Sequence, residues 1–387
     1  MRGGRAPRTD RDVPPAQPRL RDHGACLIAG LVDLAAQLVA IDSVNPELIA
    51  GAAGERQIAD FVSTWCEHAG LDVELAGTPI RPSVIAIARG SGGGRSLLLN
   101  AHLDTVGVAG MDAPFEPRIA DGRLYGRGSY DMKGALAAIL DAAAKVENLR
   151  GDVIVTAVAD EELASIGTIA VLERVHADAA IVVEPTELKL AVAHKGFVGF
   201  EIETHGVAAH GSRPHLGVDA IAKMGPVLVA LKQLDERLKA GTRHPLLGVG
   251  SVHASLIVGG QEFSSYPARC LLSGERRTIP GETSQQVETE LRQIASEAQW
   301  RLTVGREPFE VAEEEPLVQL VGRTAGETER VGVSFWADSG LIAAAGIPTV
   351  LYGPVGDGAH AEVEWVDLDS VERVRDVVLE TAVKWCG

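Results

Sequence analysis

Three short apolar runs, each followed by polar side chains, constrain the fold of this chain more than any other feature. The run SLLLNA leads into His102, VIVTAVA leads toward Glu161 and Glu162, and AAIVV leads into Glu184. Apolar runs of this length indicate buried strands, and segments with helical periodicity lie between them. Strands that alternate with helices form a mainly parallel sheet with helices on both faces. We therefore expect an α/β domain.

One of the helical segments illustrates the periodicity. Ile58, Phe61, Val62 and Trp65 fall at positions i, i+3, i+4 and i+7, and Gly70 suits the helix end. The pattern predicts a helix with one apolar face toward the sheet.

A different pattern begins near residue 196 and ends near residue 306. The strands FVGFEIET, SVHASLIV, ARCLLSGE and WRLTV are interleaved with helices expected over 221–238 and from Thr283. The resulting order, β-α-β-β-α-β, is that of a ferredoxin-like α+β unit. After it the first pattern returns, with the strand GIPTVLYG and a final helix near Asp367. We expect the second unit to interrupt the first, with the segments 1–25 (a loose leader), 26–195 with 307–387, and 196–306.

Composition excludes several classes of partner. Acidic residues outnumber basic ones by 53 to 36, giving a net charge of −17 that repels nucleic acids and anionic membrane surfaces. No apolar run approaches the ~20 residues that cross a bilayer. The four cysteines are scattered, and the leader lacks the apolar stretch of a secretory signal. We expect a cytoplasmic protein with reduced cysteines.

Ligands of open α/β sheets bind outside the carboxyl ends of the strands. His102, Glu161, Glu162 and Glu184 follow three such strands, and Asp131 lies where the Gly-rich turn GRGSYD enters a long Ala/Leu helix. Any one of them alone would be interpreted as a cap or a surface residue, and Asp131 as a helix N-cap. Their joint placement at one edge predicts a site.

Imidazole and carboxylates without a thiolate suit zinc or a similar divalent ion, and several carboxylates allow one to bridge two metals. Two such metals acidify a shared water and polarise a carbonyl. The spacing also places Asp104, two residues after His102, to accept the other ring N–H of that histidine. The alternative for Asp104 is a turn cap.

Seven separated motifs resemble one enzyme family. They are NAHLDTV, GRGSYDMKGALAA, DEELASIGT, VVEPTE, AAHGSRPHLGVDAI, ERRTIPGE and GPVGDGAHAEVEWV, in that order. Together they resemble the acetylornithine deacetylase, succinyl-diaminopimelate desuccinylase and carboxypeptidase G family, from about Leu27 to the C terminus. The resemblance implies that 26–195 with 307–387 is a catalytic metal-binding domain and 196–306 a lid and dimerisation domain.

The resemblance also implies roles for individual residues. It implies that His102 and Glu184 bind one zinc, that Glu162 and His360 bind the other, and that Asp131 bridges them. Glu161 is then the general base, which later returns its proton to the departing amine.

Two residues of the lid segment also receive roles from the resemblance. His210 is expected to stabilise the oxyanion, often across a dimer interface, and Arg277 to clamp a substrate carboxylate. Arg276 is expected to form a surface ion pair, and a surface role stays open for His210 and Arg277. The chain departs from the family in GGQEFSSYP, where Ser264 replaces an expected Asn.

The expected function is hydrolysis of an N-acyl amino acid by a two-zinc amidohydrolase, with Co²⁺ or Mn²⁺ as alternative metals. A metallo-dipeptidase, aminopeptidase or carboxypeptidase acting on a short peptide is the alternative, and Glu rather than Asp at position 184 favours the deacylase and carboxypeptidase branches. A non-catalytic binding protein is a third hypothesis, although no candidate ligand or Glu161 is lost. GRGSYD is a poor nucleotide-binding turn because Asp131 repels pyrophosphate, and GxxxxGK[ST], GxSxG and HExxH do not occur.

Overall fold

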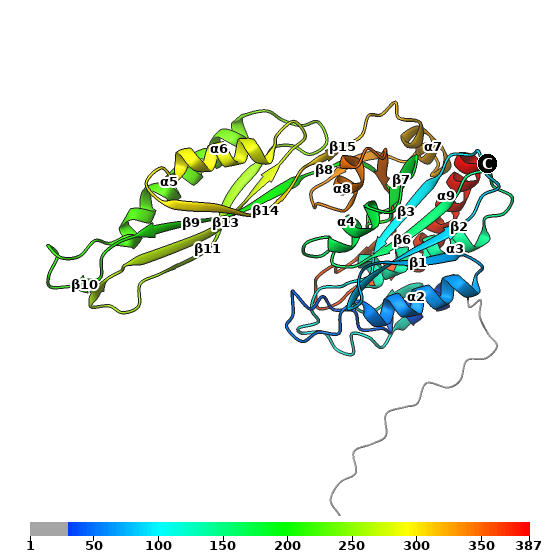
Figure 1. The fold of residues 1–387 in the computed structure, drawn as a ribbon, viewed down its shortest axis with the longest axis horizontal. Helices are drawn as coiled ribbons and strands as arrows, with labels where there is room; N and C mark the ends of the chain where they lie inside the picture. Colours follow the sequence, from blue (N-terminus) through cyan, green and yellow to red (C-terminus); the bar gives the residue numbers. More distant parts are fainter. Residues whose placement is uncertain (1–29) are drawn as a thin grey trace, which may run out of the picture.

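A computed structural model describes residues 30–387 of the chain. The expected leader, 1–25, and residues 26–29 lie outside the described residues. Figure 1 shows a broad body, formed by residues 30–195 and 307–387, and a narrow arm, formed by residues 196–306.

The body is built on a nine-stranded sheet with the order β1-β2-β6-β3-β7-β17-β8-β15, in which β16 also pairs with β8. The central strands β6, β3, β7 and β17 run parallel. Antiparallel pairs occur toward both edges, so the sheet is mixed. The expected α/β fold class is confirmed, with parallel pairing concentrated at the centre. The strands are β1 (Asp72–Thr78), β2 (Arg81–Ala88), β3 (Leu97–His102), β6 (Val153–Val158), β7 (Ala179–Val182), β8 (Leu190–His194), β15 (Phe309–Glu310), β16 (Arg330–Val333) and β17 (Thr349–Leu351).

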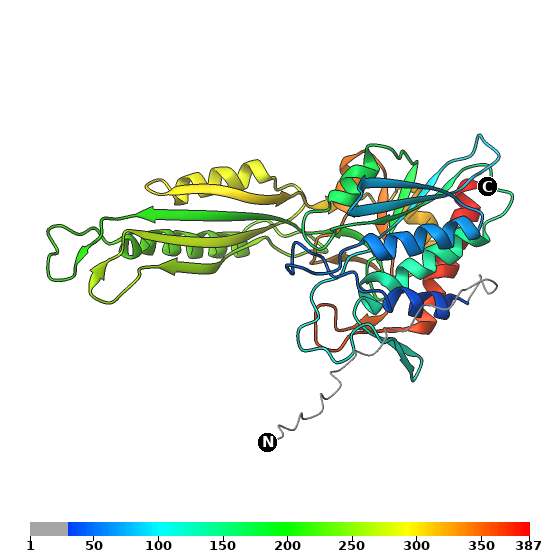
Figure 2. The same cartoon turned by 60° about the horizontal axis from the view of Figure 1, so that its bottom comes forward.

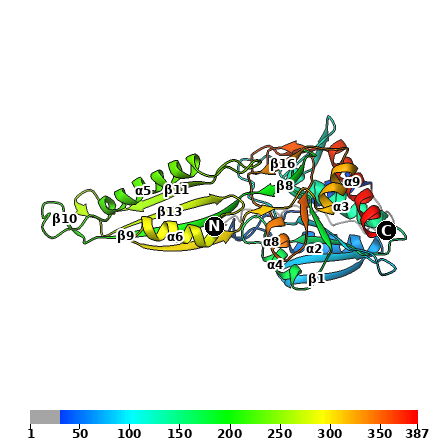
Figure 3. The same ribbon diagram turned by 90° about the horizontal axis from the view of Figure 1, so that it is seen from above.

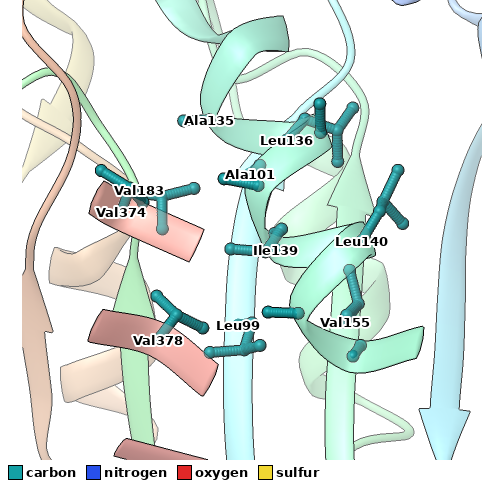
Figure 4. Close-up of a cluster of buried hydrophobic side chains, with 14 of the residues drawn as sticks. Leu99, Ala101, Ala135, Leu136, Ile139, Leu140, Val155, Val183, Val374 and Val378 are labelled. Carbon is teal, nitrogen blue, oxygen red and sulfur yellow. The ribbon is translucent and has the colours of Figure 1, made fainter. Parts of the chain in front are cut away.

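Helices cover both faces of this sheet because successive strand residues point to opposite sides. Leu97 and Leu99 of β3 pack with α1, α2, α3, α7 and α9, whereas Leu98 packs with α4 and α8. Figure 4 shows Ile139 of α3 and Val378 of α9 beside Leu99. The helices are α1 (Leu31–Val39), α2 (Arg56–His68), α3 (Gly134–Lys145), α4 (Ile166–Leu172), α7 (Pro316–Thr324), α8 (Ser339–Ala344) and α9 (Leu368–Cys386).

Local sequence explains the helix boundaries. In α2 the residues Ile58, Val62 and Trp65 are buried, and Gly70 beyond its end has a left-handed φ of 84°. The carboxylate of Asp367 caps α9 by accepting from the amide of Ser370 at 2.8 Å. None of the helices in residues 30–387 is both long and apolar enough to cross a membrane.

The arm contains a four-stranded antiparallel sheet with the order β11-β13-β9-β14. The observed order of elements is the β-α-β-β-α-β order expected from the sequence. Helices α5 and α6 lie over one face of the sheet (Figure 3), and Figure 2 turns the opposite face toward the viewer. The elements are β9 (Gly196–His205), α5 (Ala220–Ala240), β11 (Ser251–Gly259), β13 (Arg269–Thr278), α6 (Ser284–Ile294) and β14 (Gln299–Arg306).

Two smaller sheets complete the described chain. In the body, β18, β19, β5 and β4 form a second antiparallel sheet. At the far tip of the arm, β10 pairs with β12 (Figure 1). Their bounds are β4 (Arg118–Ala120), β5 (Arg123–Tyr125), β10 (Ala209–His210), β12 (Ser265–Tyr266), β18 (Gly356–Asp357) and β19 (Trp365–Asp367).

Candidate metal centre

The polar residues after the central strands lie together at one edge of the large sheet. His102 is the last residue of β3, while Glu162 and Glu184 follow the neighbouring strands β6 and β7. Asp131 belongs to the short turn η1 (Ser129–Lys133), in which Asp131 and Met132 have non-helical backbone angles, and α3 begins three residues later than expected, at Gly134. Asp131 is therefore not the N-cap of the long helix.

Two groups of possible metal ligands share Asp131. One contains His102, Asp131 and Glu184, and the other contains Asp131, Glu162 and His360, with the ligand atoms of each group within 4.8 Å of one another. One carboxylate oxygen of Asp131 lies 2.9 Å from Nε2 of His102, and the other lies 3.6 Å from Nε2 of His360. Asp131 thus faces both groups, as a bridging carboxylate would.

The other contacts hold the same two groups together. Nε2 of His102 lies 3.9 Å from Glu184, and Nε2 of His360 lies 3.1 Å from Glu162. His102, Glu162 and Glu184 are buried or nearly so, whereas the side chain of His360 is 55% exposed. One group is therefore deep, and the other opens to solvent.

The electrostatics of these groups favour a cation. Burial opposes ionisation of Asp131, but hydrogen bonds with His102 and His360 outweigh it and lower its pKa. Burial and then the charges of Asp131 and Glu162 raise the pKa of Glu184 well above its usual value, despite the opposing effect of His102. A divalent ion would relieve this repulsion between carboxylates.

The side chains of these two groups are suitable ligands for two divalent ions. Imidazole nitrogens and carboxylate oxygens are suitable zinc ligands. In addition, Oε1 of Glu162 is buried and has no hydrogen-bond partner within residues 30–387, as expected of an oxygen reserved for a metal.

Glu161 lies beside the deeper group. Burial, followed by the nearby charges of Glu184 and Asp338, raises the pKa of Glu161 well above the usual value of a glutamate. A carboxyl group with a raised pKa can exchange protons near neutral pH.

The side chain of Asp104 makes different contacts from those expected. The ring nitrogen Nδ1 of His102 lies 2.8 Å from the backbone carbonyl of Asp104 and 3.9 Å from its carboxylate. The carboxylate instead accepts from the backbone amides of Glu161, at 3.1 Å, and Glu162, at 3.2 Å. The carbonyl therefore orients His102, and the carboxylate supports the neighbouring strand end.

Glu364 is an important residue that the sequence analysis did not single out. Its buried carboxylate accepts from the backbone amides of Gly128, Tyr130 and Asp131 at 2.9 to 3.0 Å and pairs with Arg127 at 2.6 Å. Glu364 connects the turn that carries Asp131 to the loop that carries His360. The motif AHAEVEW contains this glutamate, but no local pattern links it to GRGSYD.

His210 and Arg277 lie on the arm, apart from the ligand groups. His210 belongs to β10, at the tip farthest from the body (Figure 1), and its Nδ1 shares a 2.8 Å hydrogen bond with Ser212. Arg277 lies at the base of the arm and donates to Glu275 at 2.5 Å. Arg276 was expected at the surface, but its side chain is 2% exposed and pairs with Glu282 and Glu290.

Comparisons with known proteins define the family. Residues 98–384 match Peptidase family M20/M25/M40. An acetylornithine deacetylase from Erwinia tasmaniensis is 30% identical over 93% of this chain and 98% of its own length. An acetylornithine deacetylase from Myxococcus xanthus is 31% identical over 85% of this chain and 92% of its own. The chain therefore belongs to peptidase family M20/M25/M40, and it is a hydrolase that acts on amide bonds.

Solved structures have the same fold at lower identity. An aminopeptidase from Bacillus cereus covers 92% of this chain and 98% of its own, with a TM-score of 0.75 and 20% identity. An M20 metallo-carboxypeptidase from Sulfolobus solfataricus covers 92% and 99%, with a TM-score of 0.74 and 18% identity. A dinuclear metal-binding M20 peptidase from Bacillus subtilis covers 92% and 97%, with a TM-score of 0.67 and 18% identity. The resemblance expected from the seven motifs is confirmed.

Proposed function

We propose that the protein is a two-zinc deacylase that removes the acyl group from an N-acyl amino acid. The observation that carries this proposal is the pair of ligand groups that share Asp131, with Glu161 beside them. The curated relatives named acetylornithine deacetylase support the choice of substrate class. His102 and Glu184 would hold one zinc, Glu162 and His360 the other, and Asp131 both.

The zinc ions, when bound, would acidify the attacking water and polarise the acyl carbonyl. Glu161 takes a proton from that water and later donates it to the departing amine. The carboxyl group of Glu161 holds the proton between these two steps. Co²⁺ and Mn²⁺ suit the same ligands and are alternative metals.

A substrate panel tests this function. The zinc-loaded protein should hydrolyse N-acetyl-, N-formyl- or N-succinyl-amino acids faster than dipeptides. Turnover of peptides alone would instead identify a dipeptidase, an aminopeptidase or a carboxypeptidase, the kinds of enzyme named among the solved structures. Absence of turnover despite two bound metals would indicate a binding protein.

Arg277 is the proposed clamp for the substrate carboxylate. Its guanidinium is one-third exposed and pairs with Glu275, a contact that a substrate carboxylate would replace. Arg277→Ala should raise KM and leave kcat nearly unchanged. Arg269→Ala is the matched control, because Arg269 lies on the same strand but at the far end, paired with Glu203. An unchanged KM in Arg277→Ala would remove the clamp role.

We also propose a homodimer formed through the arm. Strand β11 is an edge of the arm sheet and exposes Leu256 and Val258 by 68% and 71%, and α5 exposes Val229 by 56%. An exposed apolar edge strand is a template for pairing with a second copy. His210, at the arm tip, would then reach the second copy's site and stabilise the oxyanion there. Sedimentation of the wild type and of Leu256→Lys tests this, since a dimer that persists in the variant argues against β11 pairing.

A cytoplasmic location is the proposed setting of this function. Cys66, Cys270 and Cys386 are buried and form no disulfide bond within residues 30–387, as expected for a reducing compartment.

A further inference from the structure

We propose that Arg81 is a positioning residue for Glu161 and Glu162, and that it acts through Asn45 and the carboxylate of Asp104. The inference rests on the proposed function, because it affects catalysis only if Glu161 moves the proton. None of the seven motifs of the sequence analysis contains Arg81 or Asn45.

The turn after β6 is held in place partly by hydrogen bonds with another segment of the chain. Asp160 has a left-handed φ of 68°, and its carbonyl accepts from the amides of Leu163, Ala164 and Ser165. The amides of Glu161 and Glu162 point the other way, to the carboxylate of Asp104. One buried carboxylate thus holds the backbone of both glutamates, each oxygen accepting from one amide.

Asn45 holds that carboxylate in place. Its Nδ2 group donates to Asp104 and to Asp160, both at 2.9 Å. Its Oδ1 accepts from Arg81 at 3.1 Å and from the amide of Glu47 at 3.0 Å. The amide group uses both of its donors and both lone pairs of its oxygen, so its orientation is determined by four partners.

Within residues 30–387, Arg81 is the only arginine or lysine that contacts the cluster formed by Asn45, Glu55, Asp104 and Asp160. Its Nε donates to Glu55 at 3.0 Å, and its Nη2 contacts Glu55, Asn45 and Asp160, the last at 3.0 Å. Glu55, Asp104 and Asp160 are almost fully buried. Without the guanidinium, two buried carboxylates would lose their cation, which would shift Asn45 and then Asp104.

The planar geometry of the Arg81 guanidinium is the property on which this positioning depends. Nε and Nη2 of Arg81 donate side by side to the two carboxylate oxygens of Glu55, while Nη2 also contacts Asn45 and Asp160. The single nitrogen of an ammonium cannot present this planar pair of donors. The groups come from five separate segments: the loop after α1, the N-cap of α2, the start of β2, the end of β3 and the end of β6. Arg81 therefore aligns the strand end that carries Glu161 with the end that carries His102.

Arg81→Lys tests the proposal because it keeps the charge and removes the planar fork. At saturating zinc we expect kcat to fall ~10–100-fold, the usual cost of losing an outer supporting contact, with KM unchanged. Asn45→Ser is the second variant, since it breaks the link to Asp104 and leaves the ion pairs of Arg81 intact. Arg89→Lys is the matched control, because Arg89 also contacts two carboxylates, Asp72 and Asp152, but at the surface.

A second measurement does not depend on activity. Amide hydrogen exchange in a peptide covering residues 159–165 of the metal-free protein should be ~10-fold faster in Arg81→Lys and Asn45→Ser than in the wild type or Arg89→Lys. The proposal is overturned if both variants melt earlier yet keep wild-type kcat and exchange well below their melting temperatures. If the wild type hydrolyses no amide, the proposed function fails, and the exchange result alone decides the positioning role.

Discussion

Asp131 is the residue on which both ligand groups depend. Its two oxygens face His102 and His360, and its backbone amide is held by the carboxylate of Glu364. The same carboxylate pairs with Arg127, so the position of the shared ligand is set by buried contacts rather than by a flexible loop.

Replacement of Glu161 by Gln should separate proton transfer from metal binding. We expect kcat to fall by at least ~10², the lower size of a general-base effect, while the protein keeps two zinc ions per chain. Steady-state kinetics and metal analysis of the same sample measure both quantities. Glu187→Gln, an exposed glutamate beyond the end of β7, is the control and should leave kcat unchanged. Loss of zinc in proportion to loss of activity would instead make Glu161 a metal ligand.

Local sequence patterns predicted the position of residues at strand ends. They did not predict residues whose partners are distant in the chain. His102 and Glu184 follow buried strands, so their place at one sheet edge could be predicted from the apolar runs. Asp104 accepts from the ring of His102 as expected, but through its backbone carbonyl, because its carboxylate turns toward amides beyond β6. Arg81 and Glu364 act through partners distant in the chain, and no spacing rule indicates such contacts.

At the scale of elements, strand β8 joins the body to the arm. It ends at His194, whose ring is fully buried between Phe309 and Trp336 and whose Nδ1 lies 3.0 Å from the carbonyl of Lys195. Its Nε2 has no hydrogen-bond partner among residues 30–387. The order of the elements was predictable from periodicity, whereas this packing at the junction was not, because it unites residues more than a hundred positions apart.

The junction should make stability depend on pH. Burial lowers the pKa of His194 from 6.5 to about 4, so below pH 6.5 the unfolded chain takes up a proton that the folded chain refuses. Stability is therefore present above pH 6.5 and is lost as the pH falls toward 4, by on the order of 3 kcal/mol. Denaturant unfolding of metal-free wild type and His194→Phe should show this as a difference in free energy that changes over that window.

Phe309→Leu is the control for this measurement, because it alters packing against the same ring without removing a titrating group. Its free energy of unfolding should be lower than that of the wild type by a similar amount at each pH. If the free energies of unfolding of wild type and His194→Phe changed in parallel between pH 4 and 6.5, the pH dependence would not come from His194.

At the scale of the whole molecule, the metal centre couples folding to pH. Hydrogen bonds with Asp131 and Glu162 raise the pKa of His360 to about 10, and contacts with Asp131 and Glu184 raise the pKa of His102 against the effect of burial. The imidazole of His360 is therefore protonated at pH 7 in the metal-free protein, and it must lose its proton before it can bind zinc.

Zinc should stabilise the fold less as the solution becomes more acidic. Loading at pH 7 should release a proton from His360, and the rise in melting temperature on adding zinc should shrink from pH 8 to pH 6. Calorimetric titrations in buffers of different ionisation enthalpy measure the protons, and thermal scans measure the stabilisation. His360→Gln should release about one proton fewer than the wild type. Zinc affinity that does not vary with pH would argue against these protonation states.

The chain enters and leaves the arm on neighbouring strands, since Phe197 of β9 lies opposite Arg306 of β14. A replacement of the arm therefore requires only two junctions, which already lie next to each other in space. All candidate ligands belong to segments outside those junctions. Recombination between related genes can thus exchange the arm while the sheet that carries the candidate ligands is inherited unchanged.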